Sequence, residues 1–149
     1  MRYGKICILA DADSDGLHIA TLLCALFLRH YKPLVQEGRI YISMPPLYRI
    51  DCGKDVLYAL DNDQRDQIVN DFKKKKGKPK INIQRFKGLG EMNPSQLRET
   101  VMDPATRQLV NLSITSSDNA NSLMDLLLSK KNAPARKEWL EKKGSLAKI

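Results

Sequence analysis

Three aspartates stand at every second position of the segment ILADADSDGLHI (8–19), namely Asp11, Asp13 and Asp15. Three carboxylates this close repel one another, so their spacing costs free energy unless a cation lies among them. In an extended backbone, residues at i, i+2 and i+4 project to the same side. Carboxylate oxygens are hard ligands that suit Mg²⁺ or Mn²⁺. The spacing therefore predicts a divalent-metal site in which these three aspartates are ligands and catalytic groups.

Two other interpretations of this segment compete with a metal site. The spacing begins like a calcium-binding EF-hand loop, but position 12 of that loop would be Leu22, where a bidentate glutamate is needed. A strand, and not a helix, is also expected before the aspartates, so we do not expect calcium sensing. The second interpretation is a solvated acidic turn in which Asp15 caps the next helix and Gly16 eases the corner. That interpretation stays open on this segment alone.

A second segment, QRFKGLGEM (84–92), combines basic residues with glycines. Arg85 and Lys87 stand beside two glycines that would let the backbone approach a ligand closely. The segment is not a Walker loop, which needs Ser or Thr after GK, and it lacks the third glycine of a dinucleotide fingerprint. Phosphate contact and an ordinary tight turn with solvated charges are both compatible with it.

Two further residues are candidates for a phosphate contact. His18 lies three residues beyond Asp15, on the first turn of the expected helix, although a lone histidine there is often only a packing or capping residue. Arg136 stands near the start of the last expected helix, where a positive side chain opposes the helix dipole. A phosphate partner would help to explain that placement, and a solvated helix end is the alternative.

The hydrophobic pattern predicts the elements that position the acidic segment. KICILA (5–10) is a short apolar run typical of a buried strand. Residues 17–31 are apolar on nearly every face, which favours a buried helix that Pro33 should kink or end. RIYISM (39–44) predicts a second strand, so the three elements form one βαβ unit. The aspartates then follow the carboxyl end of a strand, where open α/β sheets usually carry their sites.

The rest of the chain predicts a hairpin followed by alternating helices and strands. Residues 47–51 and 55–60 flank a glycine turn, and residues 62–76 have acidic residues early and lysines late, as a helix favours. A strand at 81–86 and a helix from Asn93-Pro94 to about Met102 come next. The expected elements after that are a last strand at 110–114 and two short helices at 121–131 and 135–144.

Length and composition favour one compact domain, or one domain that carries a short appendage. The chain has 149 residues, of which 42% are hydrophobic, and 25 Lys and Arg against 17 Asp and Glu give a formal charge of +8. That balance favours an anionic partner, nucleic acid first. Three cysteines without a CxxC pair suggest neither a disulfide framework nor a zinc site. Those cysteines fit a reducing, cytoplasmic setting. The longest apolar run, Ile19 to Leu28, is about half of a bilayer span, so we expect a soluble protein.

Several motifs together resemble a known family. DADSDGLHI, PPLYRI, QRFKGLGEMNPSQLRET and the closing WLEKKG are similar to the TOPRIM region of bacterial type IIA topoisomerases, over roughly Arg2 to Gly144. The run DADSDGLHIATLLCALF and the short span between PPLYRI and QRFKGLG resemble the B subunit of topoisomerase IV more than the B subunit of gyrase. The gyrase TOPRIM region is the alternative within the family, and a non-catalytic basic nucleic-acid-binding module is the alternative outside it.

The resemblance implies an α/β fold, with a Rossmann-like TOPRIM parallel sheet flanked by helices in residues 1–115 and a helical extension in residues 116–149. It implies that the sheet holds Mg²⁺, for which Mn²⁺ could substitute. The expected partners are double-stranded DNA and the A subunit of topoisomerase IV, which supplies the catalytic tyrosine, in a heterotetramer that decatenates and relaxes DNA. The metal role then falls to Asp11, Asp13 and Asp15, and DNA contact falls to His18, Lys87, Arg136 and, less directly, Arg85.

One departure from the family pattern concerns the metal site. The family's first metal residue is a glutamate in an upstream EGDSA segment, and Glu37-Gly38-Arg39 does not match that segment. The regions that bind ATP and couple its hydrolysis also precede TOPRIM in the family. The chain is therefore expected to be a carboxyl-terminal fragment with an incomplete metal site, inactive in ATP hydrolysis and DNA cleavage by itself.

Overall fold

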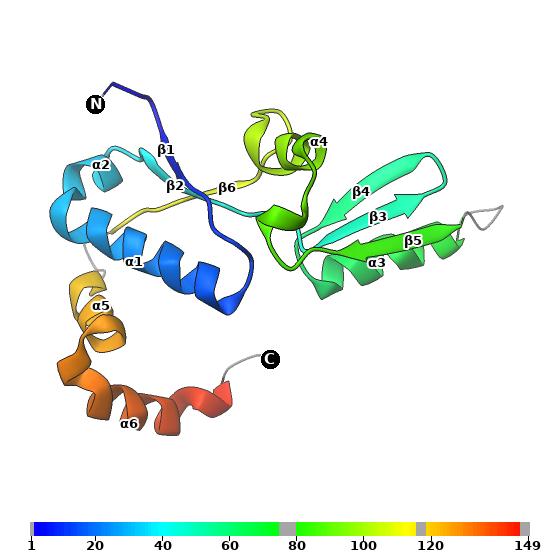
Figure 1. The fold of residues 1–149 in the computed structure, drawn as a ribbon. Helices are drawn as coiled ribbons and strands as arrows, with labels where there is room; N and C mark the ends of the chain where they lie inside the picture. The colour runs from blue at the N-terminus through cyan, green and yellow to red at the C-terminus, as the bar shows by residue number, and fades with distance from the viewer. Residues whose placement is uncertain (1, 75–79, 116–118, 147–149) are drawn as a thin grey trace.

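The computed structural model describes residues 2–74, 80–115 and 119–146 (Figure 1). The first unit of the fold is strand β1 (Ile6–Ile8), helix α1 (Ser14–His30) and strand β2 (Ile40–Ser43). β1 and β2 pair in parallel, with Ile6 opposite Ile40. This arrangement confirms the predicted βαβ unit, although α1 begins three residues before the predicted start.

Helix α1 ends close to the proline that was expected to stop it. A second short helix, α2 (Lys32–Gln36), has Pro33 in its first turn, where the missing amide hydrogen of proline costs no helical hydrogen bond. One face of α1 packs on the sheet, which buries the apolar residues of both elements against each other. The buried residues of this core are Ile8, Ala20, Cys24, Leu28, Val35 and Ile40.

The third strand of this sheet is antiparallel to its neighbour, whereas the family resemblance implied a parallel sheet. β6 (Leu109–Asn111) pairs antiparallel with β2, so only the β1–β2 pair is parallel. The chain leaves the sheet after Ser43 and returns at the same end, where the Met44 amide donates to the Gln108 carbonyl at 3.0 Å. A strand that returns beside the end it left from must run antiparallel. The class is α/β, but the sheet is not wholly parallel.

A second, antiparallel sheet follows after Pro45-Pro46. Its order is β4–β3–β5, formed by β3 (Tyr48–Cys52), β4 (Asp55–Ala59) and β5 (Ile81–Arg85). The β3–β4 hairpin and the later strand confirm the sequence prediction, and Gly53 takes a positive φ of 66° in the hairpin turn. Helix α3 (Asn62–Lys74) lies along the sheet and buries Phe72 against it (Figure 1). The predicted helix ran to residue 76, and residues 75 and 76 lie outside the described part.

The connection between the two sheets contains short helical turns. A 3-10 turn (Leu89–Glu91) precedes α4 (Pro94–Leu97), and a π-helical turn (Arg98–Met102) continues it. Asn93 and Gln96 form a reciprocal capping box at the start of α4, which accounts for the predicted helix beginning at Asn93-Pro94.

The last elements form a helical extension. α5 (Ala120–Leu128) and α6 (Ala133–Lys143) flank a 3-10 turn (Lys130–Asn132), and a further 3-10 turn covers Gly144–Leu146. α5 lies beside α1, as Figure 1 shows, and an ion pair joins Arg29 to Asp125. The predicted division of the chain at residues 115 and 116 stays a prediction, and residues 116–118 lie outside the described part. None of the helices in the described residues has the length and apolar character that crossing a membrane requires.

Candidate functional site

The acidic segment forms the connection between β1 and α1, at the carboxyl end of β1. This is the position that the βαβ pattern predicted. The side chains of Asp11, Asp13 and Asp15 are all exposed to solvent. They can therefore be reached by an ion or by a phosphate.

Asp13, and not Asp15, caps helix α1. Asp13 has an extended backbone, and its carboxylate accepts a hydrogen bond from the Gly16 amide at 2.7 Å. The acidic-turn interpretation named Asp15 as the cap, and the structure assigns that role to Asp13 instead. Asp15 instead lies in the first turn, where its negative charge is stabilised by the positive end of the helix dipole.

Gly16 is required by packing and not by its backbone angles. A β-carbon at this position would lie 2.1 Å from the carbonyl oxygen of Asp11, a distance that no real side chain tolerates. Gly16 has no positive φ, so an unusual backbone conformation is not the reason for glycine here. The close approach holds the main chain of Asp11 against the first turn of α1.

The KGLG turn lies directly against Asp11. The Leu89 amide donates a 2.8 Å hydrogen bond to Oδ1 of Asp11. A β-carbon on Gly88 would lie 3.0 Å from Cγ and Oδ2 of that carboxylate, so Gly88 leaves room for it. The turn is tied internally because the Lys87 amide donates to the Glu91 carboxylate at 2.9 Å. The structure thus brings together the two motifs that the sequence analysis treated separately.

The basic side chains near this turn are available to a ligand. Arg85 ends β5, Lys87 begins the turn, and both are exposed. Within residues 2–74, 80–115 and 119–146, neither side chain has an ion-pair or hydrogen-bond partner, and the same holds for the exposed His18 on α1. Lys87 follows immediately on a buried residue, Phe86, which anchors the turn in the protein.

Arg136 is bound within the helical extension. Its Nη1 donates to the carbonyl oxygens of Leu126 at 2.9 Å and Ser129 at 2.7 Å. The Leu126 carbonyl lies in the last turn of α5, and the Ser129 carbonyl follows that helix and also accepts from the Asn132 amide at 3.1 Å. The guanidinium group thus adds a donor for carbonyls at the end of the helix. The contact explains a positive charge at the start of α6 without a phosphate. A DNA contact by Arg136 stays a prediction, and it would have to use the remaining donors of the group.

The three aspartates do not form a metal cluster by themselves. In the described part of the chain, no group of three or more His, Cys, Asp and Glu side chains is arranged to hold a metal ion. A carboxylate offers about four lone-pair sites, so the bonds made by Asp11 and Asp13 leave capacity for a cation. Mg²⁺ is usually held by one or two carboxylates and completed by water and phosphate oxygens. The donors fit such a partial shell, and a site that uses all three aspartates stays a prediction.

The sequence did not show how two residues of the KGLG turn act at this site. Gly88 was noted for close approach to a ligand, whereas the structure places it against the carboxylate of Asp11. Leu89 contributes through its main-chain amide, for which the side-chain type gives no signal. The two glycines of the KGLG turn were the only sign that a backbone group acts there.

Comparison with known proteins shows what this chain is similar to. The profile of the family described as "DNA gyrase B subunit, carboxyl terminus" matches residues 78–141. The chain is 63% identical over its full length to the B subunit of DNA topoisomerase 4 from Pseudomonas aeruginosa and covers 24% of that protein. It is 59% identical over its full length to the same subunit from Escherichia coli, again covering 24%.

A gyrase subunit is also similar, at lower identity. The B subunit of DNA gyrase from Thermotoga maritima is 46% identical over 143 residues, which is 95% of this chain and 22% of that protein. The chain thus spans about a quarter of the length of the relatives it matches. The chain is similar over its whole length to one segment of the topoisomerase IV B subunits, and over most of its length to a segment of a gyrase B subunit.

Proposed function

We propose that this chain is the Mg²⁺- and DNA-binding segment of a topoisomerase IV B subunit, which supports cleavage and religation of both DNA strands by the tyrosine of the A subunit. The observation that carries the proposal is the contact between Asp11 and the KGLG turn. It joins an exposed aspartate to the turn that begins with the exposed Lys87 and follows the exposed Arg85 in sequence. The higher identity to topoisomerase IV subunits, 63% against 46% for a gyrase subunit, favours topoisomerase IV within the family.

The charges of the side chains suggest which residues would bind the metal and which would bind DNA. Asp11, with Asp13 and Asp15, would hold Mg²⁺, and Lys87, Arg85 and His18 would bind phosphates of the duplex. When bound, the ion would offset negative charge that develops on the scissile phosphate and on the leaving oxygen. In this proposal, the Leu89 amide would hold the Asp11 carboxylate against the turn that carries Lys87.

The remaining features of the proposal concern the assembly. The complete enzyme would be a cytoplasmic heterotetramer of two B and two A subunits that decatenates DNA and relaxes supercoils. ATP would bind to a domain upstream of this segment. These proposals rest on the similarity to topoisomerase IV subunits, of which this chain matches about a quarter.

The test uses the full-length B subunit reconstituted with the A subunit. Asp11→Ala is expected to abolish Mg²⁺-dependent DNA cleavage, decatenation and relaxation while ATP turnover continues. Asp71→Ala is the matched control, because Asp71 is an exposed aspartate on α3 with a single 3.7 Å ion pair to Lys74. Normal cleavage by the Asp11 variant at physiological Mg²⁺ would overturn the proposal.

A non-catalytic DNA-binding module is the second candidate, and the formal charge of +8 favours it. Such a module binds phosphates by charge, so its affinity for DNA should fall steadily as Mg²⁺ is added. A catalytic segment assembled with the A subunit should instead gain cleavage in the same titration. The two outcomes are read from the same reaction by separating cleaved from intact plasmid.

A further inference from the structure

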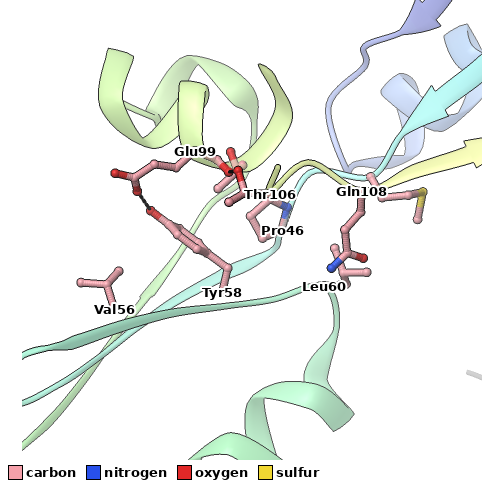
Figure 2. A pocket seen from close by; sticks show the side chains of 9 residues that line it. Pro46, Val56, Tyr58, Leu60, Glu99, Thr106 and Gln108 are labelled. Carbon is pink, nitrogen blue, oxygen red and sulfur yellow. Dashed lines mark hydrogen bonds between the residues drawn. The ribbon is translucent and has the colours of Figure 1, made fainter. Parts of the chain in front are cut away.

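A cavity of about 290 Å³ lies between the β3–β4 hairpin and the segment that contains the π-helical turn. Figure 2 shows its lining side chains, which come from both sides of the gap. Pro46, Val56 and Leu60 supply apolar walls, and Val56 is 44% exposed at the edge of the hairpin. The volume is close to the lower end of that of small-molecule pockets. The cavity is therefore large enough for a ligand of one ring.

The polar side of the cavity is formed by Tyr58 and Glu99. The Tyr58 hydroxyl donates to Oε2 of Glu99 at 3.1 Å, as the dashed line in Figure 2 shows. Burial, together with the negative charge and hydrogen bond of Glu99, raises the pKa of Tyr58, so its hydroxyl remains a donor at neutral pH. Because the Tyr58 hydroxyl donates to Oε2, the second carboxylate oxygen of Glu99, Oε1, can accept a hydrogen bond from a ligand.

The charge of the cavity is opposite to that of the chain. Among the residues that the structure describes, Glu99 is the one charged residue in the lining, which contains neither Lys nor Arg, although the chain has a formal charge of +8. Glu99 is exposed and has no ion-pair partner among the described residues within 4.0 Å. Arg49 on β3 stands opposite Tyr58 and attracts Glu99 at longer range. Its guanidinium group, however, is paired with Asp51 at 2.8 Å. An apolar pocket that ends in such a carboxylate is complementary to a molecule with an apolar body and a positive head.

We propose that this cavity binds a small organic cation, an apolar ring or short chain that carries one protonated amine. The apolar part would lie against Pro46, Val56 and Leu60, and the ammonium group would donate to Glu99. The Tyr58 ring lies in the same wall, and its face attracts a cation. This site is separate from the acidic turn and uses none of the residues proposed to bind Mg²⁺ or DNA.

The test is a titration of the isotope-labelled chain, followed by its amide NMR spectrum, with three probes that share one ring. The probes are 2-phenylethylammonium, neutral 2-phenylethanol and the anion phenylacetate. We expect saturable shifts at Tyr58, Glu99 and Thr106 with the cation, with a dissociation constant on the order of 1 mM for a ligand of this size. The alcohol should bind about fivefold more weakly and the anion more weakly still.

Two variants and one control locate the site. Glu99→Gln keeps the shape and can still accept from Tyr58, so it should weaken the cation about fivefold and leave the alcohol unchanged. Val56→Trp should fill the mouth of the cavity and abolish binding of both the cation and the alcohol. Glu138→Gln, an exposed glutamate on α6 paired with Lys142, should change neither. The proposal is overturned if the cation causes no saturable shift, if the anion binds as well as the cation, or if Glu99→Gln leaves cation binding intact.

Discussion

The carboxylate of Asp11 and the main-chain amide of Leu89 are joined by a 2.8 Å hydrogen bond across 78 residues of sequence. This bond connects the turn after β1 with the KGLG turn that follows β5. A charged acceptor makes such a bond stronger than one between neutral groups. The position of the acidic group proposed to bind the metal therefore depends on the turn that carries the basic side chains proposed to bind DNA.

The substitution Gly88→Ala tests this dependence. Its β-carbon would meet the Asp11 carboxylate at 3.0 Å, and Gly88 has φ −163° and ψ 170°, which alanine adopts without strain. The carboxylate must therefore shift while the backbone remains acceptable. We expect Mg²⁺-dependent DNA cleavage by the assembled enzyme to fall about 10- to 100-fold, since small displacements of a catalytic group have effects of that size.

Gly90→Ala is the matched control for this experiment. It lies two residues further along the same turn, and a β-carbon there would meet nothing within 4 Å. It should leave cleavage within about twofold of the parent value. Equal losses in the two variants would show that the turn needs glycine for another reason and would contradict the proposed role of Gly88.

Asp13 has two separable roles, because it caps α1 and is also proposed to bind metal. Asparagine is as good a cap as aspartate, whereas alanine loses the cap at a cost of about 0.5–2 kcal/mol. We expect Asp13→Asn to keep the stability measured by urea unfolding, but to impair Mg²⁺-dependent cleavage. Asp13→Ala should lower both the stability in urea and the Mg²⁺-dependent cleavage. Full cleavage activity in a stable Asp13→Asn enzyme would contradict the metal-binding role and show that Asp13 is only a helix cap.

The β1–α1–β2 unit could be predicted from the sequence because its pattern is strong. A short apolar run, a long apolar helix and a second apolar run leave few arrangements other than a parallel pair with the acidic turn at its carboxyl end. The direction of β6 could not be predicted in this way. Its three residues show no periodicity, and its direction is set by the place where the chain re-enters the sheet beside Met44.

The candidate site was only partly accessible to sequence reasoning. Asp13 and Asp15 both stand near Gly16, and which one caps α1 depends on where the backbone first becomes helical, a difference of one or two residues. The charge on Arg136 suggested a phosphate, but its carbonyl partners, in the last turn of α5 and just after it, become neighbours only when the two helices pack. Tertiary contacts of this kind leave no local pattern.

Arg136 is expected to contribute to stability through its two carbonyl bonds. Arg136→Lys keeps the charge but loses the geometry that reaches Leu126 and Ser129, so we expect a loss of about 1–2 kcal/mol in urea unfolding. Lys137→Ala is the control, because Lys137 is 79% exposed and makes only a 3.8 Å pair with Glu141. It should change stability by less than about 0.5 kcal/mol. Equal stabilities of the parent and Arg136→Lys would contradict the structural role.

Lys87 should act on DNA affinity and not on stability. Its side chain is exposed, and its main-chain amide is bonded to Glu91. If the ammonium group contacts one phosphate, Lys87→Ala should reduce the slope of log K against log salt by about one. Fluorescence anisotropy with a labelled duplex and the reconstituted enzyme measures this slope. An unchanged slope, with unfolding also unchanged, would exclude the contact.

The raised pKa of Tyr58 predicts that the folded protein loses stability at alkaline pH. Burial and the bond to Glu99 raise its pKa above the ordinary value of 10.0, so the folded chain holds this proton more tightly than the unfolded chain does. The resulting stabilisation is fully present below pH 10 and is lost as the pH rises through the higher pKa of the folded state. Tyr58→Phe has no proton to lose, so the difference in urea midpoint between parent and variant should shrink from pH 9 to pH 11. A difference that stays constant over this range would mean that Tyr58 ionises equally in both states.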